Sequence, residues 1–327
     1  MEITCDMILI GIGLFFAHLI VIYLLNKKTK DIRGRHVVVT GGSSGIGLWV
    51  GVTCSKLGAN VTIVARNPKW LEKAKLLIEE NRLTEAQRVE TKSLDLSKNF
   101  EDVSKGFAEI EASMGPIYML VNCAGFAMCG KVEDIDVADA KLMMDVNYFG
   151  TYYPTRYVLP KMREAQEGII VITASQAALM GIYGYSAYAA SKFALRGLAE
   201  TIAMEAKQDG ISVTLALPAD TDTPGFEREN KEKPEETKII SGSGGLAHPK
   251  DVGERIVRDA LACNFFSILG FESWVLSSMS VGVATWNGPF LTLLHVLLLG
   301  PLRLVAVGLQ WHCQYVIKKC RAKNKKD

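Results

Sequence analysis

The sequence predicts an α/β fold built on a doubly wound parallel sheet, with an apolar segment at each end of the chain. Short apolar runs alternate with amphipathic stretches from residue 36 to about residue 218, a pattern typical of a parallel sheet covered by helices. The first apolar run leads into a glycine-rich turn. Hydrophobic residues make up 49% of the 327 residues and concentrate near the termini, which favours one large domain with apolar appendages.

The N-terminal segment, residues 7–25 (MILIGIGLFFAHLIVIYLL), has no charged side chain and is long enough to cross a bilayer as a helix. A cleaved signal peptide is the alternative. However, Glu2 and Asp6 replace its basic start, and lysines follow Asn26 where a small-residue cleavage site would stand. We therefore predict a transmembrane anchor and basic flank over residues 1–30. The basic residues that follow the apolar run place the rest of the chain in the cytosol. They are Lys27, Lys28, Lys30, Arg33 and Arg35.

The central part of the chain contains five apolar segments with the composition of buried parallel strands. They are HVVVT (36–40), NVTIVAR (60–66), MLVNCAG (119–125), GIIVITAS (168–175) and ISVTLALP (211–218). A further strand is expected at about 88–94, and amphipathic helices at 69–82, 99–114 and 137–162. This alternation predicts one doubly wound domain over residues 31–262.

Two segments lie outside this alternation. Residues 220–247 are polar and follow the carboxyl end of a strand, where open α/β folds build substrate lids. Residues 263–327 are again apolar, with hydrophobic runs at 274–286 and 289–302 that Arg303 separates from a third. Two short crossings, a re-entrant hairpin and a platform lying on the membrane all fit this pattern. The final ten residues carry six basic side chains, which suits the cytosolic face.

The composition argues against several other kinds of site. The net charge is +2, and no basic stripe with interleaved aromatic residues occurs in the middle of the chain, so nucleic acid is not an expected partner. The seven cysteines form no CxxC pair, and no two of the five histidines have a metal-ligand spacing. We therefore expect neither a disulfide framework nor a metal site.

The glycine-rich turn TGGSSGIG (40–47) lies between the first strand and an expected helix. Glycines at these positions allow a tight turn and let backbone amides approach a pyrophosphate at the start of the helix. A tight turn without a ligand is the alternative. The position of the turn after the first strand of a βαβ unit favours a dinucleotide-binding site instead. The expected cofactor contacts in this turn are Gly41, Ser43, Ser44, Gly45, Ile46 and Gly47.

The end of the second strand favours NADPH over NADH. An NAD enzyme usually has an acidic residue there, which accepts a hydrogen bond from the ribose 2′-hydroxyl, whereas this chain has Arg66. An arginine would instead pair with a 2′-phosphate, with Ser43 and Lys69 as helpers. Asp95 follows the third strand and is expected to accept from the adenine amino group. Asn122, at the end of the next strand, is counted among the expected cofactor contacts and is expected to tie neighbouring strands together. An ordinary turn residue is the alternative for both Asp95 and Asn122.

Four residues have the arrangement of a carbonyl-reduction site. Tyr188 and Lys192 are four residues apart and therefore lie on one face of a helix expected from about 186 to 207. A lysine ammonium one turn away stabilises a phenolate and lowers the pKa of the phenol. Ser175, at the end of a strand, can hold a carbonyl oxygen, and Asn147 can hold a proton-relay water. Each of these features alone is common in proteins without such a site.

Together, these motifs resemble the short-chain dehydrogenase/reductase family over about residues 34–262. The motifs are TGGSSGIG, VNCAG, Asn147, Ser175 and the YxxxK of YAASK. The resemblance implies a Rossmann-type sheet and a tetrad in which Tyr188 donates the proton, Lys192 tunes it and binds the cofactor ribose, and Ser175 orients the carbonyl. Tyr188, Lys192, Pro218 and Thr221 then complete the cofactor contacts. Cys123 departs from the usual NNAG of this family, but Asn122 stays in place.

The stretch PADTDTPGFEREN (218–230) resembles a subgroup of this family that reduces long-chain sphingoid ketones. With the apolar ends, it implies a sphingoid ketone and membrane lipid as partners, and the family implies a possible homodimer. Lys323 and Lys325 resemble a dilysine retrieval signal, which implies the endoplasmic reticulum membrane with the catalytic domain facing the cytosol. Other membrane-anchored reductases, acting on retinoids, steroids or 3-ketoacyl chains, are the alternative. A tethered NADPH-binding protein without turnover is a more remote one.

Overall fold

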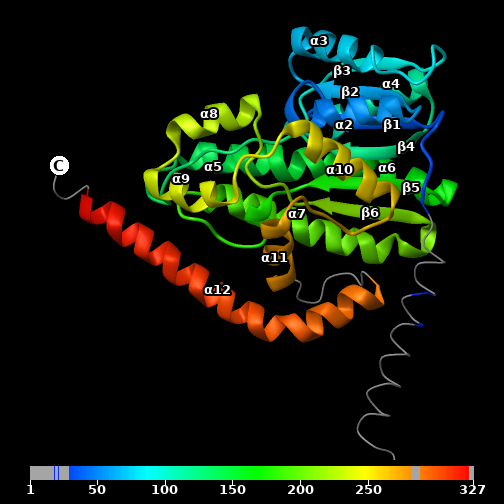
Figure 1. The fold of residues 1–327 in the computed structure, drawn as a ribbon. Helices are drawn as coiled ribbons and strands as arrows, with labels where there is room; N and C mark the ends of the chain where they lie inside the picture. Colours follow the sequence, from blue (N-terminus) through cyan, green and yellow to red (C-terminus); the bar gives the residue numbers. More distant parts are fainter. Residues whose placement is uncertain (1–17, 19–20, 22–28, 281–287, 324–327) are drawn as a thin grey trace, which may run out of the picture.

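The computed structural model describes residues 18, 21, 29–280 and 288–323. The anchor expected at 7–25 therefore lies outside the described residues, apart from two positions. Seven parallel strands form one sheet in the order β3-β2-β1-β4-β5-β6-β7 (Figure 1). Their bounds are β1 His36–Thr40, β2 Asn60–Ala65, β3 Val89–Ser93, β4 Ile117–Asn122, β5 Gly168–Thr173, β6 Ile211–Ala216 and β7 Phe266–Ser267.

Helices cover both faces of this sheet, which confirms the doubly wound fold. Those on one face are α2 (Gly45–Lys56), α3 (Pro68–Glu79) and α10 (Pro249–Leu261), and those on the other are α4 (Phe100–Met114), α6 (Gly150–Ala165) and α7 (Ser186–Glu205). A side-chain cap marks where one of these helices begins. Asn67 caps α3 by accepting hydrogen bonds from the backbone N of Lys69 and Trp70 at 3.0 and 3.3 Å.

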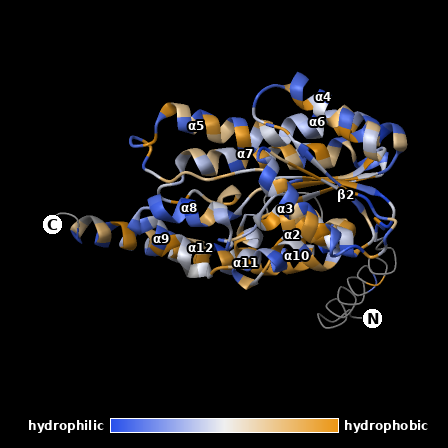
Figure 2. Ribbon diagram, turned by 90° about the horizontal axis from the view of Figure 1, so that it is seen from above, coloured by the Kyte–Doolittle hydropathy of each residue, from blue (hydrophilic) through white to orange (hydrophobic). Residues whose placement is uncertain are grey.

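The core forms in two layers because successive side chains of a strand point to opposite faces. Val38 and Leu120 pack with α4, α6 and α7, whereas Val37 and Met119 pack with α2, α3 and α10. These strand residues are almost completely buried. In Figure 2 the strands are largely hydrophobic, whereas the helices carry both hydrophobic and hydrophilic residues. The sheet is therefore a rigid base that holds the ends of its strands in fixed positions.

Two segments differ from the expected boundaries. The helix expected at 137–162 is divided into α5 (Val137–Met143), a π-helical turn (Met144–Phe149) and α6. The sheet also continues beyond residue 262, where we expected the domain to end, because β7 pairs with β6. A two-residue strand has too few apolar positions to be distinguished in sequence from the runs that follow it.

The lid expected over residues 220–247 is mostly helical. It contains α8 (Pro224–Glu232) and α9 (Glu235–Ser241). Thr223 begins α8 by accepting a hydrogen bond from the backbone N of Phe226 at 3.1 Å, and Pro224 occupies the first helical position.

After β7 the chain forms α11 (Phe271–Met279) and α12 (Pro289–Lys323). Helix α12 continues through Arg303, so 289–302 and the apolar run after Arg303 belong to one helix. The stretch Pro289–Cys320 is long enough for a membrane span and contains an 18-residue window with a mean hydropathy of 2.1. In Figure 1 it runs along the underside of the domain, past α11 and toward α9.

Candidate active site

The glycine-rich turn between β1 and α2 forms a cradle with no room for side chains. Gly41 has a φ of +67°, and a Cβ there would lie 2.7 Å from the backbone N of Ala124. A Cβ on Gly47 would lie 2.5 Å from the carbonyl O of Gly41. The backbone N–H groups at the start of α2 can therefore approach a phosphate, which the positive end of the helix dipole attracts. This turn fits the pyrophosphate of a dinucleotide.

The cradle opens into a pocket of about 1060 Å³ at the carboxyl ends of the strands. The pocket brings together most of the residues that were predicted from sequence to contact the cofactor or the substrate. They are Gly41, Ser43, Ser44, Gly45, Ile46, Gly47, Arg66, Asp95, Ser175, Tyr188, Lys192, Pro218 and Thr221. Lys69, Asn122 and Asn147 do not line it.

Arg66 and Asp95 stand on the same wall of the pocket. The exposed guanidinium of Arg66 forms no ion pair within the part of the chain that the structure describes. Asp95 accepts hydrogen bonds through Oδ1 from the backbone N and the hydroxyl of Ser97, at 3.1 and 2.7 Å. Burial opposes its ionisation, but these bonds and the charge of Arg66 hold the pKa of Asp95 below its usual range.

The residues that do not line the pocket have other positions. Lys69 lies in the first turn of α3, where its backbone N–H is taken up by the Asn67 cap. Asn122 is buried at the end of β4, and its Nδ2 donates to the carbonyl O of Val171 on β5 at 3.4 Å and to Thr155 Oγ1 at 3.2 Å. Asn122 therefore ties neighbouring strands together, as expected.

Tyr188 and Lys192 lie together on α7 at the pocket wall. The Nζ of Lys192 lies 5.6 Å from the centre of the Tyr188 ring and donates to the carbonyl O of Thr173 at 3.1 Å. Ser175 follows the end of β5, and its hydroxyl is hydrogen-bonded to Tyr188. The Ser175 Oγ also accepts from the backbone N of Ala177 at 3.2 Å, which fixes the hydroxyl at the mouth of the site.

The pKa of Tyr188 differs from the expectation that a neighbouring ammonium lowers it. Burial raises this pKa, and the carboxylate of Glu229 raises it further, whereas the hydrogen bond with Ser175 opposes the change. Burial also lowers the pKa of Lys192 to about 8, because a desolvated ammonium is costly. Burial of the Tyr188 hydroxyl therefore favours its protonated form, which is the form that can donate a proton.

Asn147 does not line the pocket, but its side chain is hydrogen-bonded to residues beside it. It lies in the π-helical turn, a feature often found at functional sites. Its side chain exchanges hydrogen bonds with the backbone of Phe126 at 2.9 and 3.0 Å and donates to Ser191 Oγ at 2.9 Å. A Cβ on Gly125 would lie 3.1 Å from Asn147 Oδ1 and 3.4 Å from Lys192 Nζ. We did not single out Gly125 from sequence, although it belongs to the VNCAG motif.

An ionic cluster within the 220–247 segment was not predicted from sequence. Lys233 is almost completely buried, and its Nζ lies 3.1 Å from both Asp220 and Glu229. The hydroxyl of Tyr185 donates to the same oxygen of Glu229. Asp220, Tyr185 and Glu229 also line the pocket. The only available sequence signal was the charged run 226–238, and such runs are usually solvated.

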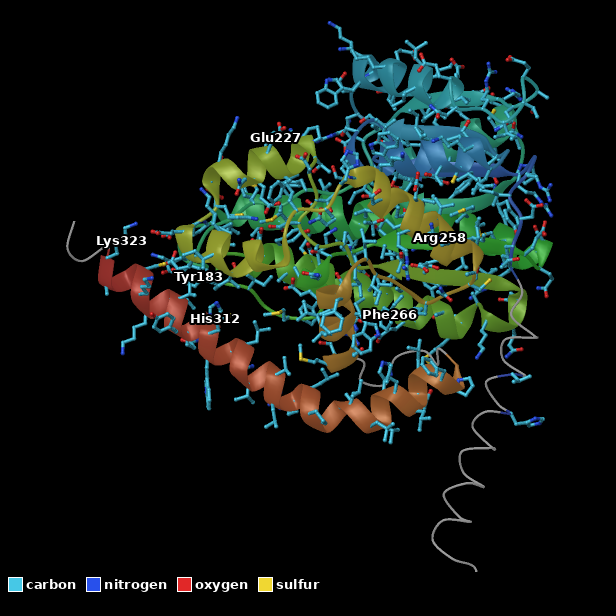
Figure 3. The ribbon with its side chains drawn as sticks, in the orientation of Figure 1. Tyr183, Glu227, Arg258, Phe266, His312 and Lys323 are labelled. Atoms are coloured by element: carbon cyan, nitrogen blue, oxygen red, sulfur yellow. The ribbon has the colours of Figure 1, made fainter. Side chains whose placement is uncertain are left out.

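The lid is also fixed to the loop that precedes α7. Thr237 on α9 donates through Oγ1 to the carbonyl O of Tyr183 at 2.7 Å (Figure 3). Glu227, also labelled in Figure 3, lies on α8 and on the pocket wall. Helix α9 is therefore bonded to the loop that precedes α7, and α8 lines the pocket that contains Ser175, Tyr188 and Lys192.

Comparison with known proteins agrees with this geometry. The family model for short chain dehydrogenases matches residues 35–234. The chain is 40% identical to a 3-ketodihydrosphingosine reductase of Bos taurus and to a 3-dehydrosphinganine reductase of Danio rerio, with 96% of this chain and of each relative covered. A 3-dehydrosphinganine reductase of Arabidopsis thaliana is 38% identical, covering 91% of this chain and 89% of the relative.

Among solved structures, levodione reductase is similar, with a TM-score of 0.67 and 25% identity. The match covers 75% of this chain and 99% of that one. The cradle, the strand-end pocket and the Tyr188–Lys192 pair lie within or next to the segment that the family model matches. The chain therefore belongs to the short-chain dehydrogenase family and is an oxidoreductase that acts on a ketone or alcohol with a nicotinamide cofactor.

Proposed function

We propose that the protein uses NADPH to reduce the 3-keto group of 3-ketodihydrosphingosine, giving dihydrosphingosine for sphingolipid biosynthesis. The observation that carries this proposal is one continuous pocket that contains the glycine cradle at one end and Ser175, Tyr188 and Lys192 at the other. The relatives that cover nearly the whole chain are named for this reaction.

The residues of the pocket have distinct roles in the proposed reaction. The bound cofactor supplies a hydride to C3 of the ketone. The phenol of Tyr188 gives its proton to the carbonyl oxygen, so that the ketone becomes a secondary alcohol. Ser175 holds that oxygen by a hydrogen bond. The charge of Lys192 stabilises the phenolate that remains on Tyr188, and Asn147 keeps α7 in place through Ser191.

Arg66 supports NADPH rather than NADH. Its guanidinium follows the end of β2, where a ribose-binding carboxylate would otherwise stand. The neighbouring hollow carries acidic as well as basic side chains, so the support comes from Arg66 itself. Its guanidinium can form charge-assisted hydrogen bonds with the 2′-phosphate of NADPH. Arg66→Glu is expected to reduce the ratio of kcat/KM for NADPH to that for NADH by about tenfold to a hundredfold, because a charge-assisted bond contributes about 1.5–3 kcal/mol.

The proposal is tested with membranes that contain the full chain, incubated with 3-ketodihydrosphingosine and either NADPH or NADH. We expect reduction with NADPH well above that of control membranes. Failure to reduce this ketone, together with turnover of a retinoid, steroid or 3-ketoacyl substrate, would support the alternative reductases. Equal rates with NADPH and NADH would contradict the role of Arg66. Absence of turnover on every ketone, with NADPH still bound, would indicate a binding protein.

We also propose a three-part organisation in the endoplasmic reticulum membrane: an anchor over 1–30, a catalytic domain that begins at 31 and extends beyond the expected end at 262 to include β7, and a membrane-associated C-terminal region that contains α12. The basic tail and the apolar surface of α12 support this arrangement. A glycosylation acceptor placed at 231–245 is expected to stay unmodified, since that segment faces the cytosol in this proposal. A homodimer is part of the same proposal and is tested by the mass of the detergent-solubilised protein.

A further inference from the structure

Helix α12 is docked against the domain along one face. Leu302, Val316 and Cys320 are 9%, 5% and 4% exposed, and Leu309 packs on the main core cluster. These positions are spaced by seven, seven and four residues, which places them on one side of a helix. At the far end, Lys323 Nζ lies 3.1 Å from Glu235 of the lid helix α9 (Figure 3). The docked side therefore extends over most of the second half of α12.

The opposite face of α12 is apolar and exposed. Leu297, Leu304, Trp311 and Tyr315 are 63%, 75%, 74% and 63% exposed. Leu304 and Trp311 each follow a docked residue by two positions, which turns them about 200° away from the domain. A helix in water would place polar residues on such a face. An apolar outer face and an apolar docked face together indicate a helix that lies between protein and lipid.

The distribution of charge does not suit a crossing of the bilayer. Arg303 divides α12 into two uncharged stretches, 289–302 and 304–317, of 14 residues each. At 1.5 Å per residue each stretch spans roughly 21 Å, less than the ~30 Å hydrocarbon core. A crossing by the whole of Pro289–Cys320 would instead put Arg303 near the bilayer centre, where a guanidinium is costly. In a helix parallel to the surface, exposed Arg303 and the terminal Lys318 and Lys319 reach the phosphate headgroups.

The docked face of α12 also reaches the active site. Leu309 lines the catalytic pocket together with Leu276 of α11, Met180 and Ile182. These side chains form an apolar portion of the pocket wall on the side where α12 lies. An alkyl chain whose reacting carbonyl is at Tyr188 would find apolar contacts there. The lipid-facing helix and the pocket therefore share one residue, Leu309.

We propose that α12 lies in the plane of the membrane surface, with Leu304 and Trp311 in the cytosolic leaflet, and that a long alkyl chain passes between the leaflet and the pocket beside Leu309. This inference rests on the proposed long-chain ketone substrate. It assigns the outer face of α12 to a phospholipid surface, and it places the pocket mouth at the depth of the acyl chains.

The orientation of α12 is tested with a short polar epitope inserted after Gly288 and, in a second protein, after Asp327. Antibody is added to sealed microsomes before and after detergent. Binding to both epitopes in sealed microsomes supports the in-plane helix. If one epitope needs detergent and the other does not, the two ends lie on opposite sides and the proposal is overturned.

The route of the alkyl chain is tested by kinetics in liposomes. Leu304→Glu is expected to raise KM for the long-chain ketone by about tenfold, because lost burial of one leucine side chain corresponds to at least that factor. Leu309→Trp is expected to raise the same KM because the larger indole obstructs the route of the alkyl chain. A short-chain analogue with the same amino-ketone head should show an unchanged KM. Leu76→Glu on α3, where the leucine is 61% exposed, is the matched control and should behave as wild type.

The two proposals fail in different ways. If the wild-type protein reduces neither ketone, the proposed function is wrong. If it reduces both, but Leu304→Glu and Leu309→Trp match wild type on the long-chain ketone, the function stands and the route past α12 is overturned.

Discussion

The hydroxyl of Tyr185 donates to Oε1 of Glu229 and thereby joins the catalytic helix to the lid. Tyr185 immediately precedes α7, and its ring lies 5.2 Å from that of Tyr188, centre to centre. The same oxygen of Glu229 accepts from Lys233 at 3.1 Å. The lid therefore brings a carboxylate close enough to the catalytic phenol to change its pKa.

Glu229→Gln is expected to lower the pKa of Tyr188, because the negative charge of Glu229 contributes to raising it. In the proposed mechanism run in reverse, the oxidation of dihydrosphingosine, Tyr188 is the base and must first lose its proton. Activity in that direction therefore rises with pH through the pKa of Tyr188, and the rise should move to lower pH in the variant. Glu232→Gln, on the same helix, should leave the profile unchanged. An unshifted profile for Glu229→Gln would contradict the proposed electrostatic role.

Tyr188→Phe is expected to reduce kcat for ketone reduction by at least about a hundredfold, since positioned general acids contribute that much or more. The variant retains the ring, which packs on Tyr185, but has no proton to donate. NADPH affinity, measured by the fluorescence of the bound cofactor, should change little. Tyr183→Phe serves as the control, and substantial activity in Tyr188→Phe would show that another group supplies the proton.

Gly47→Ala is expected to abolish tight cofactor binding. The added Cβ would lie 2.5 Å from the carbonyl O of Gly41, so the cradle must distort, at a cost of about 1–3 kcal/mol in folding stability. Gly197→Ala provides a contrast, because a Cβ there meets nothing within 4 Å and α7 gains up to about 1 kcal/mol in helix propensity. Thermal unfolding with and without NADPH measures both effects. A Gly47→Ala protein with wild-type stability and NADPH affinity would contradict the cradle.

Lys233→Met is expected to destabilise the lid by about 1.5–3 kcal/mol, because the partly buried carboxylates of Asp220 and Glu229 would lose the charge-assisted bonds to their buried cation. Lys231→Met, two residues earlier and exposed, should change stability by no more than about 0.5 kcal/mol. Thermal unfolding and limited proteolysis of the 224–241 segment distinguish the two variants. Equal protease resistance would show that the buried cluster does not hold the lid closed.

The alternation of strands and helices was predictable because it depends on local periodicity. The run HVVVT coincides with β1, and the expected first strand residues of β2, β5 and β6 agree with the structure. Three expected strands ended two or three residues too late, after the bounds that β4, β5 and β6 reach. The chain leaves the sheet there to form the pocket, whereas apolar residues such as Ala174 and Leu217 continue each run in the sequence. The π-helical turn that contains Asn147 has no periodic signal of its own.

The sequence by itself determined the sheet, the glycine cradle and the placement of Tyr188 and Lys192 on one helix face, because these follow from spacing along a few neighbouring residues. Only the tertiary structure decided that Glu229 and Lys233 form a buried cluster beside Tyr185, since the same charges could equally face solvent. It also decided which face of α12 is docked and that Leu309 reaches the pocket. Such contacts join residues far apart in the chain, and their energies depend on burial that no local pattern records.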